Sequence, residues 1–254
     1  MPPRDENGNS ATLDLLYLIS LQNAVEIEKN VGEDYYYYQK LKLQEEKLSL
    51  AVVAKYWNPK TKMFSEKPGE EIYSQHANAL AVIAKIVKGE EAKQLMAKTL
   101  KEKNIIPCSI YFKYYLHEAV NKAGLGDIYL DLLEDWNVQL SRGVTTWAET
   151  AATDTRSDCH AWGASPNILM YKIILGIESD APGFKKVRIA PNLGKLKKAS
   201  GKIPHPDGEI VVDYAIDKKG KLAAKVHLPP GVTGVFVWKG QERILISGEQ
   251  VFVL

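Results

Sequence analysis

The stretch IVVDYAIDKKGKLAAKVHL, residues 210–228, decides the fold class. Apolar side chains alternate with polar or small ones on both sides of the turn sequence DKKG at 217–220. A period of two is typical of strands with one buried face, so we predict a β-hairpin. The turn sequences PPG, KG and SG separate three further short apolar runs downstream. The end of the chain is therefore predicted to be an antiparallel β-sandwich.

Before Gly176 the apolar residues recur with the period of a helix instead. Short connections such as the GLG turn at 124–126 make successive helices antiparallel neighbours. We predict a fold class of α then β, with antiparallel helix pairs over residues 1–176 and the β-sandwich over residues 177–254. The seven expected helices lie at about 10–32, 37–56, 74–84, 90–102, 112–123, 129–140 and 164–175.

The composition is that of an ordinary globular protein. Of the 254 residues, 25% are charged and 45% hydrophobic, and 33 Lys plus Arg face 31 Asp plus Glu. A formal net charge of +2 supplies no field that would attract nucleic acid or an anionic membrane. Residues 177–254 hold 13 basic and 8 acidic side chains, without the interleaved aromatic residues of a nucleic-acid surface. We predict neither nucleic-acid nor membrane partners.

Other sequence features exclude further classes of protein. Cys108 and Cys159 are too few for a disulfide scaffold and lack zinc-site spacing, which leaves their redox state open. The motif LHEAVN at 116–121 has Asn121 where a zincin helix needs its second histidine, so we predict no metal and no cofactor. The N-terminus has no signal-peptide core, and Tyr171 and Lys172 interrupt the longest aliphatic stretch, so localisation stays unknown.

The loop GVTTWAETAATDTRSDCHAWG, residues 143–163, carries the candidate chemistry. It holds two tryptophans, three carboxylates, an arginine and a histidine, where a plain helix connection is short and rich in Gly, Ser and Asn. Exposed tryptophans suit the flat apolar face of a sugar ring, and a nearby carboxylate can take a proton from water. Glu149 is the candidate base. In the structural alternative, Trp147 and Trp162 are inter-helix core, and Glu149 and Asp158 cap helices.

His76 has two interpretations as well. It stands in a polar triplet, Ser74 to His76, that opens an apolar helix. Such a triplet either caps the helix or borders a cleft.

Four segments resemble the catalytic region of the α-L-rhamnosidases of glycoside hydrolase family 78, and the match is collinear over nearly the whole chain. The resemblance implies an (α/α)6 toroid that hydrolyses terminal α-L-rhamnosyl residues of glycans or glycosides with inversion. By the motif, Glu149 matches the general base and His160 matches a histidine that contacts rhamnose. The flanking residues Trp147, Asp158 and Trp162 are assigned to the pocket. The segments are PPRDENGN at 2–9, SQHANAL at 74–80, TTWAE at 145–149 and SDCHAWGASP at 157–166.

This sequence departs from the family at the proton donor. The family's acid lies on an Arg-Asp-Glu segment followed closely by Gly-Trp and Gly-Asp, and no such continuation is present. The segment Arg4-Asp5-Glu6 matches a later part of the barrel, so we reject Glu6 as the acid. Seven helices are little more than half of a twelve-helix toroid. We therefore expect the C-terminal part of a larger enzyme, inactive alone, with open barrel surface that favours self-association.

Two other functions remain open from the sequence. The toroid fold also hosts other glycosidases and polysaccharide lyases. A chain without the acid could instead be a non-catalytic sugar-binding protein. The resemblance leaves a periplasmic or extracellular location open for the full-length protein.

Overall fold

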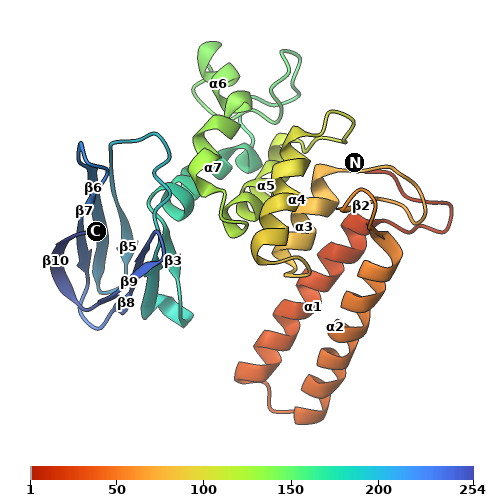
Figure 1. The fold of residues 1–254 in the computed structure, drawn as a ribbon, viewed down its shortest axis with the longest axis horizontal. Helices are drawn as coiled ribbons and strands as arrows, with labels where there is room; N and C mark the ends of the chain where they lie inside the picture. The colour runs from red at the N-terminus through yellow and green to blue at the C-terminus, as the bar shows by residue number, and fades with distance from the viewer. Residues whose placement is uncertain (1) are drawn as a thin grey trace. The chain divides into compact units, whose positions relative to one another are not determined.

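The computed structural model describes residues 2–254, in which helices precede strands along the chain (Figure 1). The structure divides into two compact units, one ending at Leu125 and the other running from Gly126 to Leu254. Each unit is described here by itself. Along the chain, the helices give way to the strands of the two larger sheets at Gly176, inside the second unit.

The first unit is helical. Helices α1 and α2 form a long hairpin whose two arms lie side by side (Figure 1). Helix α3 packs against α1, α4 and α5. The predicted loop before Tyr73 also contains a small antiparallel hairpin, β1–β2, which periodicity cannot detect in two-residue strands. The elements are α1 (Ala11–Val31), α2 (Tyr35–Tyr56), β1 (Trp57–Asn58), β2 (Met63–Phe64), α3 (Gln75–Ile83), α4 (Gly89–Lys101) and α5 (Ile110–Lys122).

The buried carboxylate of Glu66 joins the N-termini of α1 and α3. It accepts hydrogen bonds from Thr12 Oγ1 at 2.6 Å and the Thr12 backbone N–H at 3.3 Å. Ser10, the N-cap of α1, donates to it at 3.4 Å, and Ser74, the N-cap of α3, donates its hydroxyl as well. Helix N-termini carry partial positive charge, so two of them stabilise one buried anion.

The helical part of the second unit differs from the prediction. The expected sixth helix is a 3₁₀ helix and a short α-helix, because Leu133 leaves helical geometry (φ −91°, ψ 21°). The expected seventh helix ends as a π-helix, and at this end Asn192 donates two hydrogen bonds of 3.1 Å to the carbonyl of Ile173. The elements are η1 (Gly126–Leu132), α6 (Glu134–Ser141), η2 (Ala161–Ala164), α7 (Ser165–Leu169) and η3 (Met170–Ile174).

Two four-stranded sheets complete the second unit, in the orders β10-β7-β6-β5 and β3-β4-β8-β9. The predicted hairpin is present as β6–β7. One strand pair differs from the predicted antiparallel arrangement: β4 and β8 pair in parallel, so the second sheet is mixed. The elements are β3 (Ile177–Ser179), η4 (Pro182–Phe184), β4 (Lys186–Ile189), β5 (Lys198–His205), β6 (Gly208–Ile216), β7 (Leu222–Leu228), β8 (Thr233–Trp238), β9 (Gln241–Leu245) and β10 (Gly248–Val253).

Aromatic residues form the core of the β part and connect it to the helical segment before it. Tyr214 and Phe236 are fully buried with ring centroids 6.0 Å apart, and Phe252 packs edge-on against Phe236. The Tyr214 hydroxyl donates to the carbonyl of Leu175 at 2.9 Å. Burial raises the pKa of Tyr214, so the hydroxyl stays a hydrogen-bond donor.

Replacing Glu66 tests its role at the two helix N-termini. We expect Glu66→Ala to lower the free energy of unfolding by at least about 3 kcal/mol, because it leaves several buried donors unpaired. Glu66→Gln keeps the shape and is expected to cost about half as much. Chemical denaturation measures both. As the control, Glu70→Ala removes an exposed ion pair with Lys67 and is expected to cost less than about 0.5 kcal/mol. A Glu66→Ala chain as stable as this control would contradict the role.

Candidate active site

The loop of residues 143–163 folds back on itself as an irregular hairpin. The backbone N–H of Glu149 donates to the carbonyl of Ser157 at 2.9 Å, and that of His160 donates to the carbonyl of Trp147 at 2.7 Å. The Thr146 hydroxyl adds a 2.5 Å hydrogen bond to the Asp158 carbonyl. These bonds bring the segment around Glu149 against the segment around His160.

Helix α6 holds the base of this hairpin. Gln139 accepts a hydrogen bond from the backbone N–H of Ala148 at 2.8 Å, and Trp136 donates its indole N–H to the carbonyl of Gly163 at 2.7 Å. The two residues stand three apart, on one face of the helix. The sequence predicts a helix at about 129–140, which includes Trp136, but it does not predict either contact. The signal in the sequence was the i, i+3 spacing of a side-chain indole and a side-chain amide, two groups that form hydrogen bonds when they are buried.

Gly163 is required by close packing in this hairpin. A Cβ atom at this position would lie 2.8 Å from the carbonyl oxygen of Ala148 and 3.0 Å from Cβ of Trp147. Backbone atoms cannot move aside as a flexible side chain can. Any larger residue would therefore push the two arms apart.

The predicted site residues all lie on this hairpin or at its end. The side chain of Glu149 is 17% exposed, and Trp147 and His160 are half-buried. The His160 ring packs against the Trp162 ring, with centroids 4.1 Å apart, and Trp162 is 40% exposed. Asp158 is exposed and contributes its backbone carbonyl to the hairpin. The loop thus offers two aromatic rings, an imidazole and a carboxylate on one short stretch.

Arg156 pairs with Glu149, and sequence reasoning did not assign it. Its Nη2 and Nε atoms bind the two carboxylate oxygens of Glu149 at 2.7 and 3.1 Å. The Arg156 side chain is 75% exposed, whereas Glu149 is largely buried. The Arg156 guanidinium is hydrated when it leaves, whereas the mostly shielded Glu149 carboxylate loses a bidentate partner, so this pair is stronger than one exposed on both sides.

Helix capping does not account for the loop carboxylates. Side chains of Ser10, Asp34 and Ser74 cap α1, α2 and α3. The N-termini of η2 and α7 have no side-chain cap, and the side-chain hydrogen bonds of Glu149 run to Arg156. The capping alternative therefore finds no support at Glu149.

His76 lies in the other unit and is not the cap of its helix. Ser74 fills that role, with its hydroxyl accepting from the backbone N–H of Ala77 at 2.9 Å. The His76 ring is buried against Phe112, with centroids 4.3 Å apart, and its Nδ1 atom has no hydrogen-bond partner within residues 2–254. Burial lowers the pKa of His76 to about 4.

Residues 2–254 contain neither a metal-binding cluster nor a membrane-spanning helix. Residues 2–254 hold no group of three or more His, Cys, Asp or Glu side chains placed to bind a metal ion. Cys108 is buried and Cys159 is exposed, and neither is in a disulfide. Within the same residues, every helix is too short or too polar to cross a bilayer.

Two family models match successive parts of the chain. The model of the bacterial alpha-L-rhamnosidase 6 hairpin glycosidase domain matches residues 1–174. The model of the bacterial alpha-L-rhamnosidase C-terminal domain matches residues 176–252. The chain belongs to the bacterial α-L-rhamnosidase family of glycoside hydrolases, as the sequence motifs predicted.

Similar proteins extend the match. An alpha-L-rhamnosidase of Alteromonas sp. (strain LOR) is 28% identical over 138 residues, which is 48% of this chain and 15% of that protein. The GH78 family rhamnosidase of Bacillus sp. GL1 superposes with a TM-score of 0.81 at 21% identity, over 92% of this chain and 27% of that one. The Streptomyces avermitilis alpha-L-rhamnosidase complexed with L-rhamnose gives 0.78 at 17% identity, over 95% and 26%. The predicted fold class, part of an α/α toroid followed by a β domain, is confirmed.

The buried imidazole of His76 makes stability depend on pH. His76 stays neutral in the folded chain down to about pH 4, whereas its ordinary pKa is 6.5. The unfolded chain therefore binds more protons between these values, and the free energy of unfolding falls as pH drops from 6.5 to 4. The contribution of His76 to the slope is at most about 1.4 kcal/mol per pH unit, and the buried His117, whose pKa is lowered to about 3, adds the same contribution in both chains. Denaturation of the natural chain and of His76→Gln at several pH values measures it. We expect a shallower slope in the variant, and identical slopes would contradict the linkage.

Proposed function

We propose that this chain is the C-terminal part of an inverting α-L-rhamnosidase that removes terminal α-L-rhamnosyl residues from glycans or glycosides, with Glu149 as general base. The match of the helical family model over residues 1–174 carries this proposal. The Alteromonas relative and the Streptomyces structure, which is a complex with L-rhamnose, support the substrate class.

Glu149 has the setting that a base requires. Its backbone is held on one arm of the hairpin, and its carboxylate is mostly shielded from bulk water. To activate a water molecule, Glu149 needs one oxygen that Arg156 does not occupy. We propose that the exposed Arg156 side chain swings away from Glu149 when substrate enters.

The other predicted residues would bind the sugar. His160 and Trp162 form a contiguous imidazole–indole pair, which can combine a hydrogen bond to a hydroxyl with contact to an apolar ring face. Trp147 and Asp158 complete the proposed pocket from the same hairpin. No step of this proposal uses a metal or a cofactor.

The general acid is proposed to come from outside this chain. In an inverting glycosidase the two carboxyl groups lie about 6.5–9.5 Å apart, with water between the base and the sugar. The chain spans 27% of the Bacillus protein and 15% of the Alteromonas protein. We propose that residues 1–176 are the C-terminal part of the barrel and residues 177–254 the C-terminal β-sandwich domain. Without the acid, the chain alone should turn over about 10²–10⁴-fold more slowly.

Replacing Glu149 in the complete enzyme tests its assignment as base. We expect Glu149→Gln to reduce kcat on an aryl α-L-rhamnoside by about 10²–10⁴-fold, because the amide cannot accept a proton from water. Rhamnose should still bind with unchanged affinity by calorimetry. Asp154→Asn, an exposed carboxylate of the same loop, is the matched control and should retain full turnover.

Three results would redirect the proposal. Full turnover of Glu149→Gln would remove Glu149 from the mechanism. A product with ultraviolet absorbance would indicate an unsaturated sugar and a lyase instead of a hydrolase. Rhamnose binding without turnover in the complete protein would indicate a sugar-binding protein.

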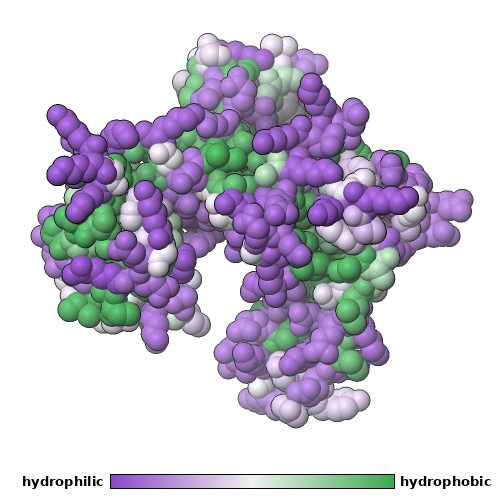
Figure 2. All heavy atoms as spheres, viewed as in Figure 1, coloured by the Kyte–Doolittle hydropathy of each residue, from purple (hydrophilic) through white to green (hydrophobic). Residues whose placement is uncertain are grey.

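Self-association of the isolated chain is a further expectation. Apolar side chains are exposed on the α1–α2 hairpin, including Val31 on α1 and Leu50 on α2, and Figure 2 shows hydrophobic residues among hydrophilic ones there. We expect light scattering after size exclusion to show a mass that rises with concentration. A paired Leu43→Lys and Leu50→Lys variant should shift the chain toward monomer. A monomer at every concentration would refute self-association.

A further inference from the structure

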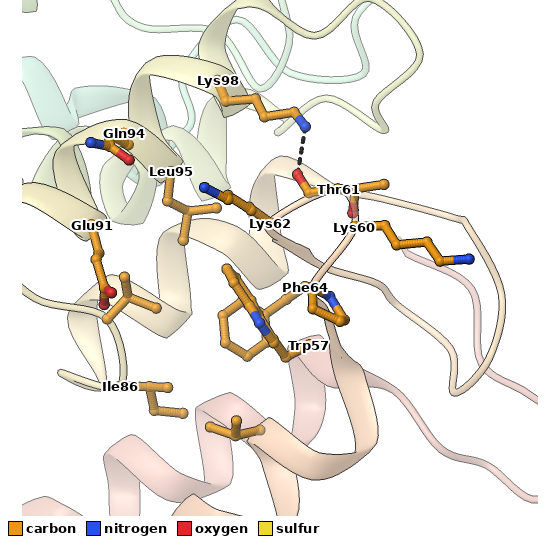
Figure 3. A pocket seen from close by; sticks show the side chains of 13 residues that line it. Trp57, Lys60, Thr61, Lys62, Phe64, Ile86, Glu91, Gln94, Leu95 and Lys98 are labelled. Carbon is orange, nitrogen blue, oxygen red and sulfur yellow. Dashed lines mark hydrogen bonds between the residues drawn. The ribbon is translucent and has the colours of Figure 1, made fainter.

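A cavity of about 740 Å³ lies in the first unit, and residues 53–98 alone supply its lining (Figure 3). The end of α2, the β1–β2 hairpin and α4 line it, and no residue of the loop 143–163 takes part. Its volume is within the range of cavities that bind small molecules, about 300–1,000 Å³. The catalytic proposal does not use this cavity.

The centre of the cavity is aromatic and apolar. Trp57 is half-buried and packs against Phe64, with ring centroids 5.0 Å apart and planes 55° apart. Ile86 and Leu95 extend the apolar lining on the side of α4 (Figure 3). Such a surface favours contact with the carbon-rich face of a sugar ring. It disfavours strongly hydrated groups, which would lose their water there.

The rim of the cavity is cationic. Three lysines line it against a single carboxylate, that of Glu91. Lys98 donates to the backbone carbonyl of Thr61 at 2.5 Å, which holds its ammonium group at the rim. The exposed Lys60 and Lys62 make no ion pair with any residue in the part of the chain that the structure describes. The excess of positive charge favours an anionic ligand.

Lys62 adopts a backbone conformation that favours glycine. Its φ is 52°, in the turn between β1 and β2, where its N–H donates to the carbonyl of Asn58 at 2.7 Å. Asn58 Oδ1 secures the same turn by accepting from the backbone N–H groups of Lys60 and Thr61 at 3.0 and 3.3 Å. Figure 3 shows the Lys62 side chain directed toward Leu95, while Lys60 points away. This turn places the Lys62 side chain beside the apolar centre of the cavity.

We propose that this cavity is a second saccharide site that binds an acidic sugar, with the ring face on Trp57 and the sugar carboxylate between Lys62 and Lys98. The exposed Gln94 and Glu91 can bind hydroxyl groups of the same sugar. The choice of a sugar among anionic ligands rests on the proposed function. The site would hold an acidic part of the glycan chain while rhamnose is removed elsewhere.

Calorimetry on the full chain tests this site, with digalacturonate as the probe and uncharged galactobiose as its neutral counterpart. We expect digalacturonate to bind, with affinity that falls as salt is raised, and galactobiose to bind at least about fivefold more weakly. Lys62→Gly removes the cation and suits the positive φ, so it should keep the thermal stability of the chain. Because this variant loses one exposed charge pair with the ligand, its affinity for digalacturonate should fall about fivefold.

Lys239→Gly is the matched control, because Lys239 also has a positive φ, 49°, in a hairpin turn, and does not line the cavity. It should bind digalacturonate like the natural chain. Equal affinity of Lys62→Gly and the natural chain would overturn the site, and so would equal affinity for galactobiose. Competition by inorganic sulfate as strong as by digalacturonate would overturn the sugar assignment. Binding here does not require turnover, so either result leaves the test of Glu149 independent.

Discussion

The packing of the first unit depends on one buried anion, the carboxylate of Glu66. Burying a charge in the protein interior is unfavourable. Removing the carboxylate from water costs several kcal/mol unless hydrogen bonds replace the lost hydration. Here the replacement comes from the N-termini of α1 and α3 and from the hydroxyls of Ser10, Thr12 and Ser74. The two helices are thereby held at a common end, and α3 in turn packs against α4 and α5.

The candidate site is organised mainly by backbone hydrogen bonds. Pairing of the Trp147–Glu149 arm with the Ser157–His160 arm orients four of the proposed side chains, and α6 anchors both ends of the hairpin through Gln139 and Trp136. Such a loop can vary its exposed residues without losing its shape. Because backbone hydrogen bonds hold the hairpin, its shape does not depend on Arg156. The exposed Arg156 side chain can therefore leave the proposed base without unfolding the loop.

The second unit joins the loop-bearing helices to the β-sandwich through polar contacts with backbone carbonyls. Asn192 binds the carbonyl of Ile173, and Tyr214 binds that of Leu175. These carbonyls would otherwise lack partners at the end of a helix. The two hydrogen bonds connect the site-bearing segment directly to the aromatic core of the sheets.

The sequence by itself determined the order of elements, most helix boundaries, the β6–β7 hairpin and the family, because these depend on local periodicity, caps and short motifs. Ser10 and Gly32 bound α1 as predicted. The loop of Trp147 to Trp162 was identified from its composition alone. The tertiary structure decided what depends on partners distant in sequence. Periodicity could not reveal that the last helix would end as a π-helix, that β4 and β8 would pair in parallel, or that one carboxylate would bind two helix ends. The pairing of Arg156 with Glu149 and the cavity around Trp57 likewise required side chains to be placed in space, since charge and exposure at a site are set by whatever packs around it.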